Sequence, residues 1–164
     1  GRDPIGRTML EGFNTLATQL GNGEAFNDWD FSLSPGILQS DKEEELSSRV
    51  RRMPSLDEPW DLLCSVRALA VLTPLGFGFK TTIVDALAAG CHVLVHPKLA
   101  QRLPPDVRAH CIELNPRETI DALSVKQRLA REPNTQQINH VLREQAAGEL
   151  HRAFGTQRET KKFN

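Results

Sequence analysis

The residues best suited to chemistry gather in one short stretch, which follows an apolar run and leads into a helical pattern. Two glycines there, Gly76 and Gly78, would let a ligand approach the backbone closely. Lys80 adds a cation between Phe79 and Thr81, where the N–H groups at the start of a helix would be free. This combination predicts a cradle for a diphosphate. The alternative is a tight strand-to-helix turn with one exposed lysine.

The spacing of the glycines separates this stretch from two familiar phosphate-binding loops. A P-loop needs a glycine, four further residues and then Gly-Lys, and this spacing is absent. A dinucleotide fingerprint needs a third glycine, but Thr81 occupies that place. A dinucleotide-binding oxidoreductase domain is therefore disfavoured. No residue is assigned a catalytic role.

A histidine-rich segment near the next apolar run offers a second place for chemistry. On a strand, His92 and His96 would share one face and Cys91 would lie on the other, so a zinc ion would lack ligands. We therefore predict no metal site. His96 could contact a ligand at the end of the strand, or it could cap the turn before Pro97.

Strands must position these residues, and three apolar runs have the required form. They cover residues 68–72, 91–95 and 110–114, and each stops at a polar residue followed by proline. Short apolar runs with sharp ends are typical of strands buried on both faces of a parallel sheet. Residues 29–33 and 49–53 predict two further strands.

Helical periodicity separates the strands. An apolar stripe over residues 9–20 predicts the first helix, and Thr8 and Glu11 have the spacing of a capping box that would start it. Residues 1–7 would then form a loop. Gly90 stands where a left-handed glycine would end a later helix. The other expected helices cover residues 41–48, 57–66, 81–89, 118–123 and 136–154.

The order of these elements predicts the fold class. Strands that alternate with helices indicate an α/β, Rossmann-like, doubly wound parallel sheet, here ending in a long C-terminal helix. Ligands bind such sheets at the carboxyl ends of the strands. The segments that follow the predicted strands, together with residues 1–7, are therefore where a ligand is expected.

The stretch over residues 76–95 resembles the signature of the group-1 class of GT-B glycosyltransferases. It reads Gly-Phe-Gly-Phe-Lys-Thr-Thr-Ile-Val-Asp-Ala-Leu-Ala-Ala-Gly-Cys-His-Val-Leu-Val. Residues 1–7 are similar to the Gly-Arg loop of that family, and residues 50–54 resemble the segment near its nucleotide base. The chain departs from the family at Phe77, where many members carry a glutamate, and at His92, where proline is usual.

The resemblance implies roles for single residues. Arg2 and Arg7 would meet the phosphates of a sugar donor together with Lys80. Asp85, at the family's acidic position, would accept hydrogen bonds from the ribose. The sequence resembles only the C-terminal, donor-binding half of such an enzyme, whose N-terminal half binds the acceptor.

The resemblance also implies a domain division and a partner. Residues 1–155 would form a nucleotide-sugar-binding domain, and residues 156–164 a flexible tail. The donor would be a UDP- or GDP-sugar, without a separate cofactor. The partner would be an N-terminal acceptor-binding domain, and the chain alone would be inactive. A noncatalytic interaction or regulatory domain that keeps this shape is the alternative.

Composition excludes several other classes. The 164 residues carry a formal net charge of −1, whereas a sequence-blind nucleic-acid binder would need a large basic excess. No apolar run approaches the roughly 18 residues of a membrane span. The three cysteines are widely spaced, which favours buried reduced thiols and a cytoplasmic location.

Overall fold

The computed structural model describes residues 4–34, 46–54, 58–75 and 81–159. Within these residues, strands form two small parallel sheets, one of order β1-β2 and one of order β3-β4-β5. The mixed α/β class is confirmed, and each predicted strand is present within two residues of its predicted bounds. The strands are β1 (Phe31–Leu33), β2 (Val50–Arg52), β3 (Ala68–Val71), β4 (His92–Val95) and β5 (Cys111–Glu113).

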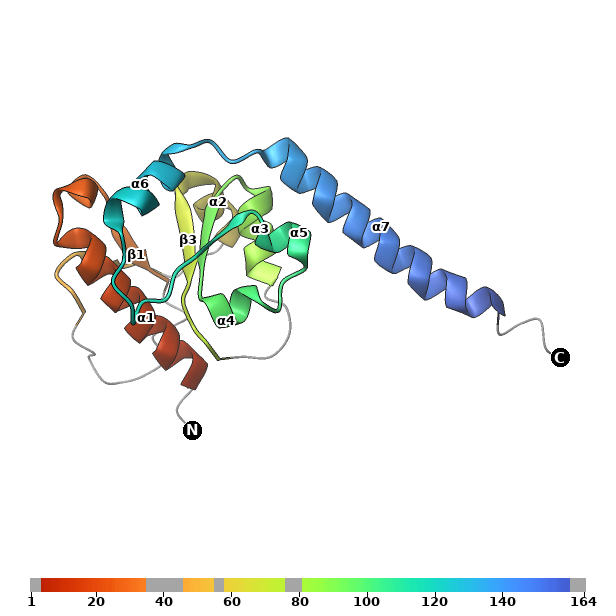
Figure 1. Cartoon of the computed structure of the whole chain (residues 1–164), viewed down its shortest axis with the longest axis horizontal. Coiled ribbons are helices and arrows are strands. Elements are labelled where there is room, and N and C mark those ends of the chain that lie inside the picture. The colour runs from red at the N-terminus through yellow and green to blue at the C-terminus, as the bar shows by residue number, and fades with distance from the viewer. Residues whose placement is uncertain (1–3, 35–45, 55–57, 76–80, 160–164) are drawn as a thin grey trace.

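Helices pack on both faces of the β3-β4-β5 sheet, and each face has its own apolar core (Figure 1). One core involves α1 (Pro4–Gly21), the 3-10 helix η1 (Glu24–Phe26) and α6 (Ala122–Ala130). The other involves α2 (Pro59–Ser65), α3 (Thr81–Ala88), α4 (Pro97–Ala100), α5 (Pro105–Arg108) and the start of α7 (Thr135–Glu159).

The central strand β4 explains why its sequence is a continuous apolar run. Val93 and Val95 belong to the core with α3, whereas Leu94 belongs to the core with α1. All three side chains are buried. Because successive side chains of a strand point to opposite faces, a strand covered on both faces has no polar side.

Helix α1 begins earlier than the sequence pattern predicts. Pro4 is its first residue, so the predicted cap at Thr8 is wrong, and residues 4–7 are helical rather than a loop. Proline suits this position because the first N–H of a helix has no intrahelical partner. The Thr8 hydroxyl instead lies 3.0 Å from the carbonyl oxygens of both Pro4 and Ile5.

α1 runs from the carboxyl ends of the strands toward their amino ends. Thr8, near its start, contacts Thr73, which follows β3. Gly21, at its end, lies beside Arg49, the residue before β2. The helix is therefore antiparallel to the strands, as the crossover helix of a β-α-β unit is.

Two other predicted helices differ from the structure. The helix predicted over residues 118–123 is wrong, because α6 begins at Ala122, where the Asp121 carboxylate accepts a hydrogen bond from the Ser124 N–H at 3.1 Å. Of the helix predicted over residues 41–48, residues 46–48 are not helical, and residues 41–45 lie outside the described residues.

Helix α7 packs on the core near its start and then extends away from the rest of the molecule (Figure 1). Gly90, which follows α3, lies beside Thr135 at the start of α7 and has the predicted left-handed conformation, with φ +86°. Ile138 is buried in the adjacent core, and Leu142 packs partly against it. Residues 156–159, predicted as tail, are helical, and residues 160–164 lie outside the described residues. No described helix combines the length and apolar character needed to cross a membrane.

Candidate functional site

A cleft of about 270 Å³ opens at the carboxyl ends of β3, β4 and β5. Helix α1 forms one wall with Thr8, Glu11, Gly12 and Thr15. The segments that follow the three strands form the rest, so three of the segments in which a ligand was expected meet here. These segments contribute Leu72, Pro74, His96, Lys98, Asn115, Pro116 and Arg117.

Each of the three strands is followed by a polar residue and then a proline. The polar residues are Thr73, His96 and Asn115. A residue before proline is pushed into extended backbone, and proline itself cannot donate a ladder hydrogen bond. The last residues of the three strands lie side by side in the register, Val71 opposite Val95 and Val95 opposite Glu113. Each strand is therefore followed by one polar residue at the same edge of the sheet.

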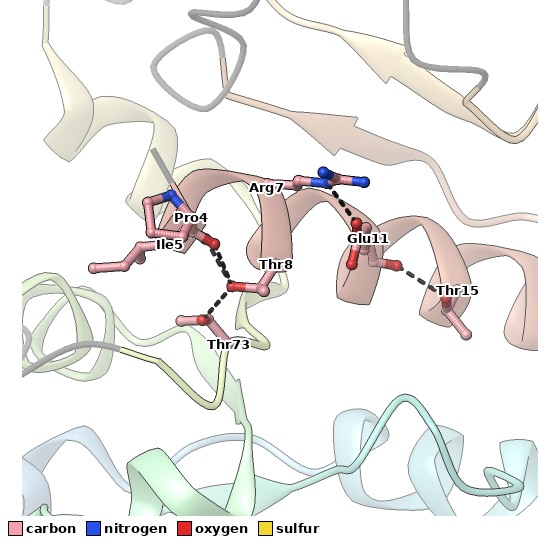
Figure 2. Close-up of polar contacts among 7 residues, drawn as sticks. All are labelled: Pro4, Ile5, Arg7, Thr8, Glu11, Thr15 and Thr73. Carbon is pink, nitrogen blue, oxygen red and sulfur yellow. Dashed lines mark hydrogen bonds and ion pairs between the residues drawn. The ribbon is translucent and has the colours of Figure 1, made fainter. Parts of the chain in front are cut away.

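Thr73 joins the end of β3 to α1 (Figure 2). Its hydroxyl oxygen lies 2.7 Å from that of Thr8 and accepts a hydrogen bond from the Leu75 N–H at 3.1 Å. Because the Thr8 hydroxyl donates to helix carbonyl oxygens, the Thr73 hydroxyl donates to Thr8. Thr73 is fully buried, and this pairing satisfies its hydroxyl. It is a positioning residue for the wall of the cleft.

His96 presents a defined tautomer at the end of β4. Its Nδ1 accepts a hydrogen bond from the Lys98 N–H at 3.1 Å and so caps α4. Since Nδ1 is an acceptor, the ring proton resides on Nε2. Burial lowers the pKa of His96, and the neighbouring charges of Lys98 and Arg117 lower it further, against the opposing effect of Glu118. The imidazole is therefore neutral near pH 7 and can donate one hydrogen bond through Nε2.

The lowered pKa of His96 predicts how stability depends on pH. The unfolded histidine takes up a proton near its ordinary pKa of 6.5, before the folded one does. The contribution of neutral His96 to the free energy of unfolding is therefore complete above pH 6.5. It is lost as the pH falls through the lower pKa of the folded state. His96→Asn keeps an oxygen that can cap α4, so we expect the stability of this variant to fall less than that of the unmodified chain between about pH 7.5 and pH 5.

Urea denaturation at both pH values measures this difference. The matched control is His140→Asn, which changes an exposed histidine on α7. An equal fall in stability for the His96 variant and the unmodified chain would contradict the prediction.

The rim of the cleft favours an anion. Lys98 and Arg117 lie there with exposed side chains. Two acids lie near these cations. The Glu11 carboxylate pairs with the Arg7 guanidinium at 2.9 Å (Figure 2), and the Glu118 carboxylate accepts a hydrogen bond from the Asn115 side-chain amide at 2.6 Å. Lys98, Arg117 and the neutral His96 are residue types that donate hydrogen bonds to a phosphate group, and all three line this cleft.

The sequence-predicted site residues are placed in three ways. Thr81 is the first residue of α3 and is exposed, and Asp85 lies exposed on the same helix; neither lines the cleft. Arg7 was expected in a loop, but it lies in α1, mostly exposed and paired with Glu11. Its expected place in a loop is therefore wrong, whereas its contact with a phosphate stays a prediction. The others, Arg2, Gly76, Gly78, Phe79 and Lys80, lie outside the described residues.

Sequence reasoning missed Lys98, Arg117 and Thr8 as cleft residues. The first two follow the His-Pro and Asn-Pro pairs, which are repeated at the ends of successive strands. That repetition was the available signal, because it marks residues that share one edge of the sheet. Within the described part of the chain, no three His, Cys, Asp or Glu side chains come together as a metal centre would require.

Comparisons of the chain with protein-family models, with curated proteins and with solved structures found no match. The geometry of the cleft and the resemblance of residues 76–95 therefore carry the functional argument.

Proposed function

We propose that this chain is the donor-binding half of a glycosyltransferase and that it holds a nucleotide-diphosphate sugar at the carboxyl edge of its sheet. The observation that carries the proposal is the cleft that Lys98, Arg117 and His96 line together, with Nδ1 of His96 occupied by the Lys98 N–H. In the order of the chain, residues 76–80 come between β3 and α3, and the residues that directly follow β3 line this cleft.

The proposed role of these residues is to bind and neutralise the diphosphate. Lys98 and Arg117 would contact its oxygens, and the free N–H groups at the start of α3 would add the positive end of a helix dipole. Charge develops on the diphosphate as the bond to the sugar breaks. Groups fixed in place before the reaction stabilise that charge without reorganising.

The resemblance supplies the finer parts of the proposal. Arg2 and Lys80 would add further phosphate contacts, and Asp85 would accept hydrogen bonds from the ribose. The two small sheets would belong to one doubly wound, Rossmann-like sheet. An N-terminal acceptor-binding domain would complete the enzyme. Cys91 and Cys111 are buried as predicted, whereas Cys64 is exposed, so the prediction of burial is wrong for Cys64; a reducing environment suits three free thiols. Without that domain we expect no sugar transfer, because the nucleophile is not oriented.

Titration of the chain with UDP, GDP, ADP and NAD by calorimetry or NMR tests the proposal. Binding of UDP or GDP, with shifts in the backbone resonances of residues 96–98 and 115–117, is the expected result. Preferential binding of NAD would favour a dinucleotide-dependent enzyme instead. Absence of binding to all four would favour a noncatalytic interaction domain.

A single substitution at the rim sharpens the test. Lys98→Ala removes a charge-assisted contact worth about 1.5–3 kcal/mol, so nucleotide affinity should fall roughly tenfold or more. The melting temperature should barely change, because the Lys98 side chain is exposed. Lys126→Ala is the matched control, since Lys126 lies on α6 outside the cleft. Equal affinities of the two variants would remove Lys98 from the site.

A further inference from the structure

A second and larger cavity, of about 420 Å³, lies between β1 and β3, and its lining is mainly apolar. Side chains of α1, among them Met9 and Phe13, line it, as do Leu62 and Leu63 of α2. Ser32 of β1 and Ala70 of β3 line it from its two sides. It is separate from the cleft that carries the proposed function. We call it the inter-sheet groove.

Both strands beside the inter-sheet groove turn toward it backbone groups that have no strand partner among the described residues. The carbonyl oxygens of Arg67, just before β3, and of Val71, at its end, accept hydrogen bonds from the backbone N–H groups of His92 and His96 on the β4 side. Alternate residues of a strand direct their N–H and C=O groups to the same side, so Ala68 and Ala70 direct theirs to the groove. Within the described residues, β3 has no strand to pair with on that side.

β1 has the same arrangement on the opposite side. The Leu33 carbonyl oxygen accepts a hydrogen bond from the Met53 N–H, so Phe31 and Leu33 direct their backbone groups to the β2 side. Ser32 and Ser34 therefore direct theirs to the groove, and both line it. β1 and β3 are therefore edge strands, each parallel to the strand with which it pairs, and the groove lies between them. On the side that faces the groove, neither strand has a hydrogen-bonded neighbour among the described strands.

The exposure of the β3 side chains also indicates that this strand lacks a neighbour on the groove side. The strands β3 and β4 have similarly apolar sequences, yet Ala68, Leu69 and Ala70 are only half-buried, whereas Val93 and Leu94 are buried. β4 has a strand on each side. β3 has one only on the β4 side among the described strands. An additional strand in the groove would give β3 the environment that its sequence suits.

We propose that the inter-sheet groove accepts an extended apolar segment of polypeptide as a parallel β-strand, which pairs with β1 and β3 and joins the two sheets into one. The direction of α1 fixes which segment this is. Because α1 begins at the carboxyl edge, beside Thr73, a strand that leads into it by a short loop ends at that edge and runs parallel to β1 and β3. The occupant is therefore a strand that enters α1 directly.

The walls specify the composition of this strand. Its alternate side chains would point toward α1, which lines the groove with apolar residues, and toward α2, which lines it with Leu62, Leu63 and Ser65. The segment is therefore a run of about five apolar residues without proline, rather than an alternating apolar-polar pattern.

The test adds such a strand to the whole chain. About five valine and isoleucine residues are placed ahead of Gly1, preceded by lysines that limit aggregation. Three matched extensions serve as controls: one of Ser and Gly, one with a central proline that removes a pairing N–H, and the apolar run attached after Asn164 instead. Hydrogen exchange of single amides and thermal unfolding are measured for all of them.

With the apolar extension ahead of Gly1, we expect the amides of Ser32, Ala68 and Ala70 to exchange at least roughly tenfold more slowly than with any control. The melting temperature should rise by at least about 4 °C. Equal exchange in all four proteins would overturn the proposal.

Two further outcomes would also overturn it. One is a dimer of the unextended chain, detected by light scattering, in which these amides are already protected. That result would make a second copy the occupant. The other is a small apolar molecule that copurifies with the chain in native mass spectrometry and that the extension does not displace.

Discussion

Replacement of Leu129 by alanine should lower the free energy of unfolding by about 2–5 kcal/mol. Leu129 is 1% exposed and packs in the core between the sheet and α1, together with Leu16, Leu20 and Phe26. The substitution removes apolar contacts and leaves a void that the helix on one side and the sheet on the other cannot close. At this chain length, the loss corresponds to a fall in melting temperature of about 4–20 °C.

The same helix supplies a control of the same residue type. Leu123 also lies on α6 but is 66% exposed, so Leu123→Ala should change the free energy of unfolding by no more than about 0.5 kcal/mol. Urea denaturation of both variants measures the contrast. Similar losses for the two leucines would mean that α6 does not pack in the orientation described above.

Replacement of Gly12 by valine should have the second-largest effect, a loss of about 3 kcal/mol in the free energy of unfolding. A Cβ at this position would lie 2.5 Å from the Leu72 carbonyl oxygen and 3.1 Å from the Leu72 Cβ. Because the first of these neighbours is backbone, α1 would have to move away from the end of β3. Gly12 also lines the cleft, so the affinity for the proposed nucleotide ligand should fall as well.

Gly148→Val is the matched control, because Gly148 is also helical and a Cβ there would have no neighbour within 4 Å. It makes the same change in side chain without the backbone clash. Chemical denaturation separates the two variants. A Gly12 variant as stable as the Gly148 variant would show that α1 does not approach β3 closely.

The strands could be predicted from sequence because burial on both faces leaves a simple pattern. Continuous apolar runs that stop at Thr73-Pro74, His96-Pro97 and Asn115-Pro116 have few other structural interpretations. The start of α1 was missed because the apolar stripe begins at Met9, whereas the backbone of the helix begins at Pro4. Pro4 could have indicated the start of the helix, because proline is common at the first helical position. The prediction instead followed the apolar stripe, which starts five residues later.

The site was harder to predict because it depends on strand order. Lys98 and Arg117 are far apart in sequence, and they share a cleft only because β4 pairs with β5. Sequence periodicity identifies strands but does not say which strands are neighbours. The sequence pattern also predicts one sheet, whereas the described strands form two, β1-β2 and β3-β4-β5.

Helix α7 changes how this molecule would behave in solution. Its 25 residues span about 37 Å at 1.5 Å per residue, and most of that length extends beyond the rest of the fold (Figure 1). A particle of this form diffuses more slowly than a sphere of equal mass. In gel filtration the chain should therefore elute ahead of a compact protein of 18.3 kDa. Such early elution would reflect frictional drag on a monomer, so oligomeric state is better measured by a method that reports mass directly.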